Sequence, residues 1–501
     1  MFTKELILAA ATVVTASAAT AAALSPSDFE VTSLPGLDNS TDLGFKHYAG
    51  HMPIGDAAGT ELFFWFVESQ RDPKNDPVVL WMNGGPGSSS IAFGFWTEHG
   101  PFRLAADSAQ PGGFKPVRYD YSWNRIANVV YVEAPSGVGL SFSKDTSKYQ
   151  NVTDEESSYD NFLFLQAFFK VFNSFAKNDF YITAESYGGH YGPTLAAQVL
   201  KQPNDFPMKG LLIGNPGINS DWYFNVNEYA FVTFCWSHGL IPAPAYFDAV
   251  EKCGWNDFFS DCARNFTNPD PACLAATTKA VGYIPSPLDP YDVIAPTCHV
   301  SAAASNDAAE ADAHAAAADA LVAARHPFLR RLRERHGRGP GGPNPLSYNP
   351  CISHWTPKYM NRADVLEALH VDPKRAQQWP WPGDAPGWSY NQGVAGEKND
   401  IALLFPTFFA QAPQWKILVV SGTADSAVPF MGTERWLNCL GRPVKADSRK
   451  WSTYDGDVAG MVKDWDHVSL ATVKGCGHTI PTYCPAKGYQ FFENWLTGVW
   501  K

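Results

Sequence analysis

The chain has 501 residues, nine cysteines and a formal net charge of −12 at pH 7. The negative charge disfavours nucleic acid as a partner, because a phosphate backbone attracts clustered lysines and arginines. The sequence contains no Cys-x-x-Cys pair and no His-Glu-x-x-His pattern, so we expect neither a metal nor a cofactor.

The N-terminus has the features of a signal peptide. Residues 1–24 carry Lys4 near the start, then an apolar run, with a small-residue stretch at 16–18 typical of a cleavage site. The run is too short and too rich in small residues for a membrane span, and no later stretch qualifies. We therefore expect a protein that enters the secretory pathway without a membrane anchor. Three glycosylation sequons, which agree with secretion, begin at Asn39, Asn151 and Asn265.

An early glycine-rich stretch follows a predicted strand. The strand is 77–82, and the glycines and serines occupy 83–90. Such a stretch is a flexible turn in many proteins, and the lysine that a phosphate-binding loop requires is missing. In α/β-hydrolases an early loop of this kind donates a backbone N–H to an oxyanion. Gly85 is the predicted donor.

The stretch 184–188 is the most informative part of the chain. It follows a predicted buried strand, 179–183, and precedes a predicted helix, 194–200. A serine flanked by small residues on a sharp strand-to-helix turn is a nucleophile elbow, which lifts the hydroxyl of Ser186 above the strand ends. The backbone N–H of Tyr187 is then the second predicted oxyanion donor.

The strand and helix signals are interrupted in the middle of the chain. They alternate from about 43 to 216 and resume near 348, and a helix is predicted to begin at Tyr359. We therefore assign 25–216 and 348–501 to two parts of one core. We interpret residues 217–347, which are helix-rich and contain five cysteines, as an insertion. The two flanks must fold as one unit, because the residues of one predicted site lie on both.

Two polar residues of the second flank each follow a predicted strand. Asp425 comes after the strand 416–420, and His478 comes after the strand 469–473. Alone, an aspartate in such a turn commonly bonds its own backbone, and a single histidine between small residues is commonly a loop residue. Together with Ser186 they have the chain order of α/β-hydrolase triads, at the carboxyl ends of sheet strands.

The combined motifs resemble the serine carboxypeptidase family, which includes yeast vacuolar and plant enzymes. The resemblance extends over nearly the whole mature chain, and the stretches that carry it are 81–87, 121–124, 134–139, 185–191, 213–216, 238–241, 425–429 and 477–478. It implies an α/β-hydrolase fold with a mixed central sheet and a helical cap. It also implies an enzyme that releases C-terminal residues from peptides and proteins at acidic pH through an acyl-enzyme.

The resemblance assigns roles to individual residues. Ser186, Asp425 and His478 would form the triad. Gly85 and Tyr187 would form the oxyanion hole. The residues that would bind the C-terminal carboxylate of the substrate are Asn83, Glu98 and Glu185.

Chemistry supports such a carboxylate site only in acid. Two glutamates can hold a carboxylate if they carry a proton, because a protonated carboxyl donates a hydrogen bond. Mutual repulsion and burial both raise the pKa of such a pair. Glu185 fits this role, since a buried acid is costly unless it binds something. Without the family pattern, Glu98 would be interpreted as a solvated loop acid.

The sequence departs from the family at several positions. Ala184 stands where the elbow usually has glycine, and Gly188 stands where alanine is usual. Ser88 replaces a cysteine whose usual partner resembles Cys351. Because nine cysteines leave at least one unpaired, we expect Cys351 to be free. Thr479 follows the histidine where methionine or glutamate is common, which bears on side-chain preference.

The stretch 302–343 stands apart within the insertion. An alanine-rich run with scattered acids, a strong helix former, is followed by six arginines and a glycine- and proline-rich end. One interpretation is a solvated helix with a flexible loop. The other is a linker that is excised, as in family members that mature to two chains.

The sequence therefore predicts a secreted, vacuolar or lysosomal serine carboxypeptidase. One alternative is a related acyltransferase that passes the acyl group to an alcohol, although Asn83, Glu98 and Glu185 favour peptides. Another is a non-catalytic partner that stabilises other hydrolases, against which the intact triad argues.

Overall fold

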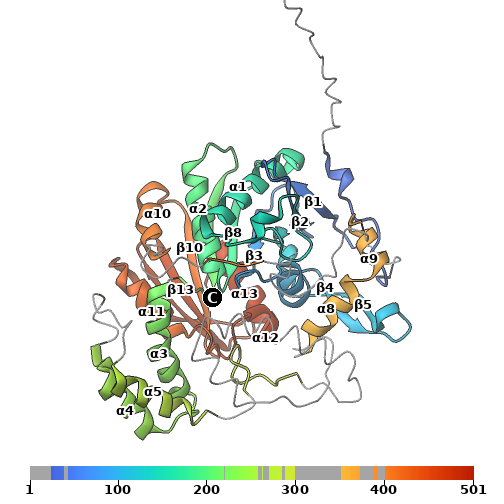
Figure 1. Ribbon diagram of the computed structural model, residues 1–501. Coiled ribbons are helices and arrows are strands. Elements are labelled where there is room, and N and C mark those ends of the chain that lie inside the picture. The colour runs from blue at the N-terminus through green and yellow to red at the C-terminus, as the bar shows by residue number, and fades with distance from the viewer. Residues whose placement is uncertain are drawn as a thin grey trace, which may run out of the picture.

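The computed structural model describes residues 24–38, 43–218, 220–257, 262, 270–284, 288–298, 351–372, 388–391 and 401–500. Within these residues, one eleven-stranded sheet runs through the molecule (Figure 1). Its strands, in spatial order, are β1 (His47–Pro53), β2 (Thr60–Val67), β6 (Asn128–Val132), β3 (Val78–Met82), β8 (Phe180–Glu185), β9 (Met208–Gly214), β10 (Lys416–Gly422), β13 (Val468–Val473), β12 (Val458–Trp465) and β11 (Val444–Ser452), and the short β7 (Phe142–Ser143) pairs with β2.

The sheet is mixed, as predicted. The six strands from β6 to β13 are parallel, whereas the strands at both edges are antiparallel. The parallel strands β3 and β8 are buried along their whole length, which explains their nearly continuous apolar sequence. All four strands predicted from the sequence are present as β3, β8, β10 and β13. Their carboxyl ends meet at one edge and position the candidate site.

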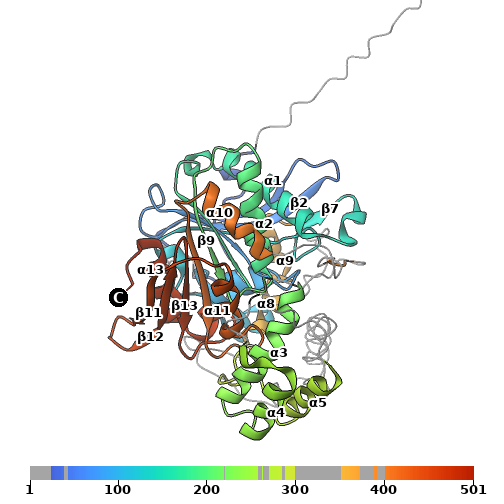
Figure 2. The same cartoon turned by 90° about the vertical axis from the view of Figure 1, so that its left-hand side faces the viewer.

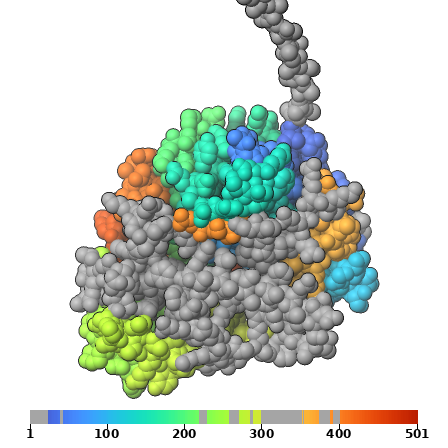
Figure 3. Space-filling view, in the orientation of Figure 1, coloured from blue at the N-terminus to red at the C-terminus, as the bar shows by residue number. Residues whose placement is uncertain are grey.

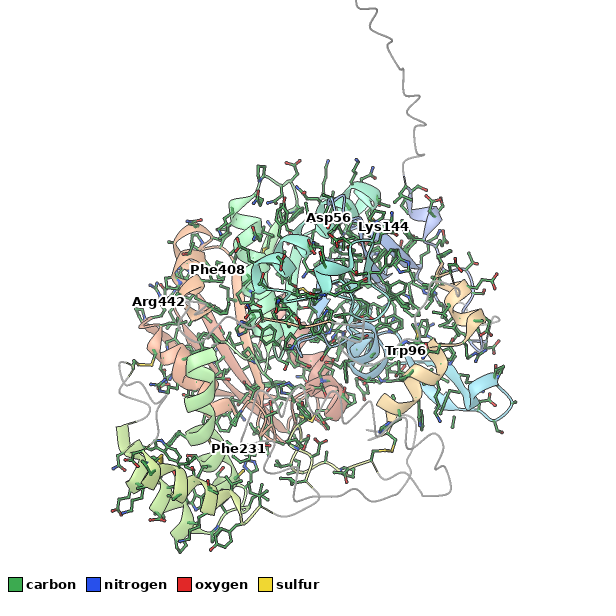
Figure 4. All side chains as sticks on the ribbon, in the orientation of Figure 1. Asp56, Trp96, Lys144, Phe231, Phe408 and Arg442 are labelled. Atoms are coloured by element: carbon green, nitrogen blue, oxygen red, sulfur yellow. A yellow bond between two sulfur atoms is a disulfide. The ribbon has the colours of Figure 1, made fainter. Side chains whose placement is uncertain are left out.

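Helices cover both faces of the sheet and form two cores. The first core contains α1 (Asp154–Val171), α2 (Gly188–Lys201), α10 (Phe405–Gln411) and α11 (Phe430–Cys439). The second contains the π-helix η2 (Ile91–His99), α8 (Ile352–Met360), α9 (Ala363–Ala368) and α13 (Pro485–Thr497), with the short α12 (Ile480–Tyr483). Figure 4 labels Phe408 in the first core and Trp96 in the second. A separate hairpin of β4 (Phe102–Ala106) and β5 (Phe114–Arg118) follows η2.

Three helices of the predicted insertion have a core of their own. They are α3 (Ser220–Ser237), α4 (Ala243–Cys253) and α5 (Pro271–Val281), and Phe231, labelled in Figure 4, lies in that core. They gather at one end of the molecule (Figure 2), and α4 and α5 form the yellow-green region at the lower left of Figure 3. The disulfide Cys253–Cys273 joins α4 to α5, and Cys262–Cys439 joins the insertion to α11. The boundaries 217 and 347 stay a prediction.

Two sequence-based expectations are wrong. Cys351 is not free: it forms a disulfide with Cys298, and the unpaired cysteine among the described residues is Cys235, which is buried on α3. The loss of a cysteine at Ser88 thus did not isolate Cys351. The second error concerns the helix predicted to begin at Tyr359, because α8 ends at Met360 and α9 begins only at Ala363. Two residues lie between the helices, and the extended backbone of Arg362 separates them.

Some predictions lie outside the described residues. They are most of the signal peptide, the stretch 302–343, and the sequons at Asn39 and Asn265. Asn151 is described, and it is exposed in the loop before α1. No helix in the described part of the chain is long and apolar enough to cross a bilayer. In that same part, no three His, Cys, Asp or Glu side chains are grouped as metal ligands would be.

Candidate active site

Ser186 lies on a sharp turn between β8 and α2. Its φ angle is +61°, in the left-handed region that residues with side chains seldom adopt. The N–H of Ser186 donates to the carbonyl of Gly214 at 2.9 Å. The carbonyl of Ser186 accepts from the N–H groups of Gly189 and Gly217, each at 2.9 Å. The turn is therefore held from both sides, as a nucleophile elbow requires.

Small residues let the neighbouring loop approach this turn. A Cβ added to Gly84 would lie 2.2 Å from the backbone nitrogen of Tyr187 and 2.8 Å from Cβ of Ser186. The loop after β3 thus lies directly against the elbow. Gly85, next along this loop, has a φ of +104°, a conformation that favours glycine. The two predicted oxyanion donors, Gly85 and Tyr187, consequently come from segments in contact.

The departures from the family pattern at Ala184 and Gly188 are coupled, because side chains at these two positions would occupy the same space. A Cβ on Gly188 would lie 2.7 Å from Cβ of Ala184, closer than two side-chain carbons approach. Only one of the two positions can carry a methyl group without a shift. The usual pattern places it at the second position, and this chain places it at the first.

A buried acid that the sequence analysis missed holds the loop after β3. Glu133 follows β6 and is fully buried. It accepts a hydrogen bond from Oγ of Ser89 at 2.7 Å and another from the N–H of Ser90 at 3.1 Å. Glu133 therefore fixes the end of the loop that contains Gly85. Glu133 lies just before the family-like stretch 134–139, so no role was predicted for it.

The structure brings Asp425 and His478 together. Nδ1 of His478 lies 2.7 Å from Oδ2 of Asp425, and both side chains are buried. The other oxygen of Asp425 accepts from the N–H groups of Ala427 and Val428, at 2.8 and 3.0 Å. Asp425 is therefore both a turn residue and the partner of a histidine. Nδ1 donates to this carboxylate, which leaves Nε2 as the acceptor of a proton.

Ser186 lies at the same edge of the sheet, directly after the strand β8. Among the described residues, no hydrogen bond joins its Oγ to the ring of His478. Such catalytic bonds are often long in a resting enzyme and tighten when substrate binds.

Asn215, at the end of β9, connects the histidine loop to β10. Its Nδ2 donates to the carbonyl of His478, and its Oδ1 accepts from the N–H of Gly422 at 2.8 Å. The disulfide Cys476–Cys484 closes a loop around the histidine. Sequence reasoning noted Asn215 only as part of a family-like stretch. Its position directly after a central strand could have indicated a structural role at the site.

The structure also brings Asn83, Glu98 and Glu185 together. Nδ2 of Asn83 donates to Oε1 of Glu98 at 2.8 Å and to Oε1 of Glu185 at 3.3 Å. Oδ1 of Asn83 accepts from the indole N–H of Trp81 at 2.6 Å and from the N–H of Gly94 at 3.0 Å. These two donors orient the amide, so that its NH₂ group faces both carboxyls.

The two glutamates share a buried, electrostatically unfavourable position. Their carboxyls lie within hydrogen-bonding distance of each other, and burial raises the pKa of Glu98. The pKa of Glu185 is raised well above its usual range, first by burial and then by the charge of Glu98. Oε2 of Glu98 is buried without a donor. A proton shared by Glu98 and Glu185 removes the repulsion between their carboxylates and lets one carboxyl donate a hydrogen bond to the other.

Comparisons with known proteins identify the family. The family model described as serine carboxypeptidase matches residues 35–498. Serine carboxypeptidase 1 of Hordeum vulgare is 34% identical over 494 residues, which cover 94% of this chain and 93% of that protein. The lysosomal protective protein of Mus musculus is 33% identical, with 94% of each chain covered.

A solved structure supports the fold. Kex1(delta)p, a prohormone-processing carboxypeptidase from Saccharomyces cerevisiae, matches with a TM-score of 0.67 and 20% identity over 95% of this chain and 96% of that chain. The family match spans both flanks of the insertion and includes every residue of the candidate site. This chain belongs to the serine carboxypeptidase family.

Proposed function

We propose that this serine carboxypeptidase cleaves the last peptide bond of peptides and proteins with Ser186 as nucleophile. The observation that carries the proposal is the pairing of two sites at one sheet edge: the buried Asp425–His478 pair and the buried Glu98–Glu185 pair. The second site recognises a free C-terminus. The first supplies the chemistry of acyl transfer.

The reaction proceeds in two halves. His478 takes the proton of Ser186 as Oγ attacks the scissile carbonyl carbon, and Asp425 stabilises the resulting imidazolium. The carbonyl oxygen becomes an oxyanion that accepts hydrogen bonds from the N–H groups of Gly85 and Tyr187. The C–N bond then breaks, and the departing amino acid takes the proton from His478. A water molecule then attacks the acyl carbon while His478 takes its proton, and the bond to Oγ breaks as Ser186 recovers that proton from His478.

The glutamate pair explains the preference for a terminal residue. With one shared proton, the pair donates a hydrogen bond to the substrate carboxylate, and Nδ2 of Asn83 can donate a second. An internal peptide bond has no carboxylate that could accept these hydrogen bonds. Because Glu185 directly precedes Ser186, a terminal carboxylate bound by the pair is held near the nucleophile, which favours cleavage of the last bond.

This recognition depends on acidic conditions. Burial raises the pKa of both glutamates, so the shared proton persists at a pH where exposed glutamates are ionised. At higher pH the proton leaves, and two negative charges face the carboxylate of the substrate. Binding of free-acid substrates should therefore weaken as the pH rises.

Four disulfides among the described residues support an oxidising compartment for the folded chain. The acid requirement and the predicted signal peptide together favour a vacuolar, lysosomal or acidic extracellular location. Exposure of Asn151 makes it the accessible sequon among the described residues.

The proposal is tested with N-blocked dipeptides as substrates. The wild-type enzyme should release the C-terminal amino acid at acidic pH, and a serine-directed phosphonate should label Ser186. The variant Ser186→Ala should fold, escape labelling and lose peptidase activity. Full activity of Ser186→Ala would overturn the assignment. Transfer of the acyl group to an added alcohol in preference to water would support the acyltransferase alternative, which the comparisons do not favour.

A further inference from the structure

A short segment of the insertion lies against both catalytic loops. Residues 288–295, here called the strap, come after α5 and before the disulfide Cys298–Cys351. The strap belongs to the yellow-green coil that passes below α12 in Figure 1. It has no regular secondary structure, so its carbonyl and N–H groups are available to other segments.

The strap holds the loop of Asp425 by four hydrogen bonds. The carbonyl of Pro290 accepts from the N–H groups of Ser426 and Ala427, both at 3.1 Å, and from Oγ of Ser426 at 2.6 Å. The N–H of Val293 donates to the carbonyl of Ala424 at 3.0 Å. The residues on both sides of Asp425 are thus bound to the insertion.

The same strap holds the loop of His478. The carbonyl of Tyr291 accepts from the backbone N–H of His478 at 2.7 Å, and the two rings lie 5.2 Å apart. The approach is so close that a Cβ on Gly477 would lie 2.2 Å from this carbonyl. Because Asp425 and His478 follow different strands, a segment bound to both loops fixes one against the other.

Two aspartates shape the strap, and one of them anchors it to α12. Asp289 accepts from the N–H of Tyr291 at 2.9 Å and from the hydroxyl of Tyr483 at 3.1 Å. Asp292 accepts from two backbone N–H groups further along, those of Ile294 and Ala295, each at 3.0 Å. Asp289 therefore sets the position of the carbonyls that hold the catalytic loops.

We propose that the strap is a positioning device for the triad, with Asp289 and Tyr483 as positioning residues that act through the backbone of Pro290 and Tyr291. The insertion then contributes to the chemical step. This inference rests on the proposed roles of Asp425 and His478. The carboxylate site lies on other elements, so its substrate affinity should not depend on the strap.

The test compares Asp289→Ala, Asp289→Asn and Tyr483→Phe with a matched control, Tyr454→Phe. The control removes a tyrosine hydroxyl that also binds a carboxylate, that of Glu493 on α13, away from the strap. The end point of phosphonate labelling counts active sites. We expect kcat per labelled site to fall about tenfold in Asp289→Ala, because small misplacements of catalytic groups are costly.

The pattern across the variants identifies positioning. Asp289→Asn keeps one acceptor oxygen, so its kcat per labelled site should lie between those of Asp289→Ala and the wild type. Tyr483→Phe should also lower kcat. In all variants KM should stay within about twofold of the wild-type value. Unchanged kcat per labelled site in Tyr483→Phe and Asp289→Asn would overturn the proposal, even if the melting temperature falls. Tyr483→Phe keeps the test decisive if Asp289→Ala does not fold. Peptidase activity in Ser186→Ala would instead contradict the proposed function, whatever the strap variants do.

Discussion

The exchange of small residues at the elbow leads to a prediction about Gly188→Ala. Its added Cβ would lie 2.7 Å from Cβ of Ala184 and 3.1 Å from the carbonyl oxygen of Met82. The first distance is about 0.8 Å shorter than the closest favourable carbon–carbon contact, about 3.5 Å. Ala184 belongs to β8 and Met82 to the paired strand β3, so neither atom can move away without displacing the elbow.

The magnitude follows from two opposing effects. Overpacking a well-packed interior costs about 1–3 kcal/mol, whereas alanine gains up to about 1 kcal/mol over glycine in a helix. We expect a net loss of about 1–2 kcal/mol in the free energy of unfolding. Because residue 188 follows Tyr187, whose N–H is a proposed donor to the oxyanion, kcat should also fall, by about tenfold or more.

A double-mutant cycle separates the clash from other effects. Ala184→Gly alone should cost about 0.5–1 kcal/mol, as glycine does in a strand. The double variant should recover stability and kcat relative to Gly188→Ala, with a coupling energy of about 1–3 kcal/mol. Urea unfolding followed by tryptophan fluorescence and steady-state kinetics measure both quantities. Gly214→Ala, where a Cβ meets only ordinary contacts, is the control. Additive single effects would refute the reasoning.

Two further predictions concern maturation and pH. Brief trypsin treatment should cut the arginine-rich stretch within 302–343 and keep activity, giving fragments of about 35 and 20 kDa by chain length. These should separate only after reduction, since Cys298–Cys351 and Cys262–Cys439 connect them; loss of activity on cleavage would mean that the stretch is structural. Stability should fall as the pH rises from about 4 to 7, because burial raises the pKa of Asp292 to about 6 and the folded state then holds a proton that the unfolded chain has released. The stabilisation from protonated Asp292 is complete below the pKa of an unfolded aspartate, near 4, and is lost as the pH passes the pKa of Asp292 in the folded protein. The melting temperature of Asp292→Asn should therefore depend less on pH than that of the wild type. An equal pH dependence in both proteins would contradict the assignment.

The sequence was most informative where function depends on local pattern. The elbow at Ser186 could be predicted because a strand, a turn of small residues and a helix follow one another within a few residues. Asp425 and His478 could be predicted because each directly follows an apolar strand, and parallel strands bring their carboxyl ends to one edge. The alternation of strands and helices indicated the parallel part of the sheet, whereas its mixed character was implied by the family resemblance.

The contacts between distant segments could not be predicted in this way. The strap at 288–295 holds the catalytic loops through backbone carbonyls, which leave no signature in side-chain type. Disulfide pairing depends on which cysteines the fold brings together, so the count of nine could not identify Cys235 as the free one. Glu133 and Asn215 read as ordinary polar residues until the buried groups that they satisfy are known.

The most direct test of the account is the pH dependence of KM for two classes of substrate on one enzyme. For N-blocked dipeptides with a free carboxylate, KM should rise above about pH 6–7, because the pair of Glu98 and Glu185 loses its shared proton. For the same dipeptides with an amidated C-terminus, KM should not show this rise, and the rate should improve with pH because His478 must be neutral to accept a proton. Glu185→Gln should reduce the difference between the classes, since an amide donates a hydrogen bond at every pH. Identical pH profiles for the two classes in the wild-type enzyme would contradict recognition of the C-terminus by the glutamate pair.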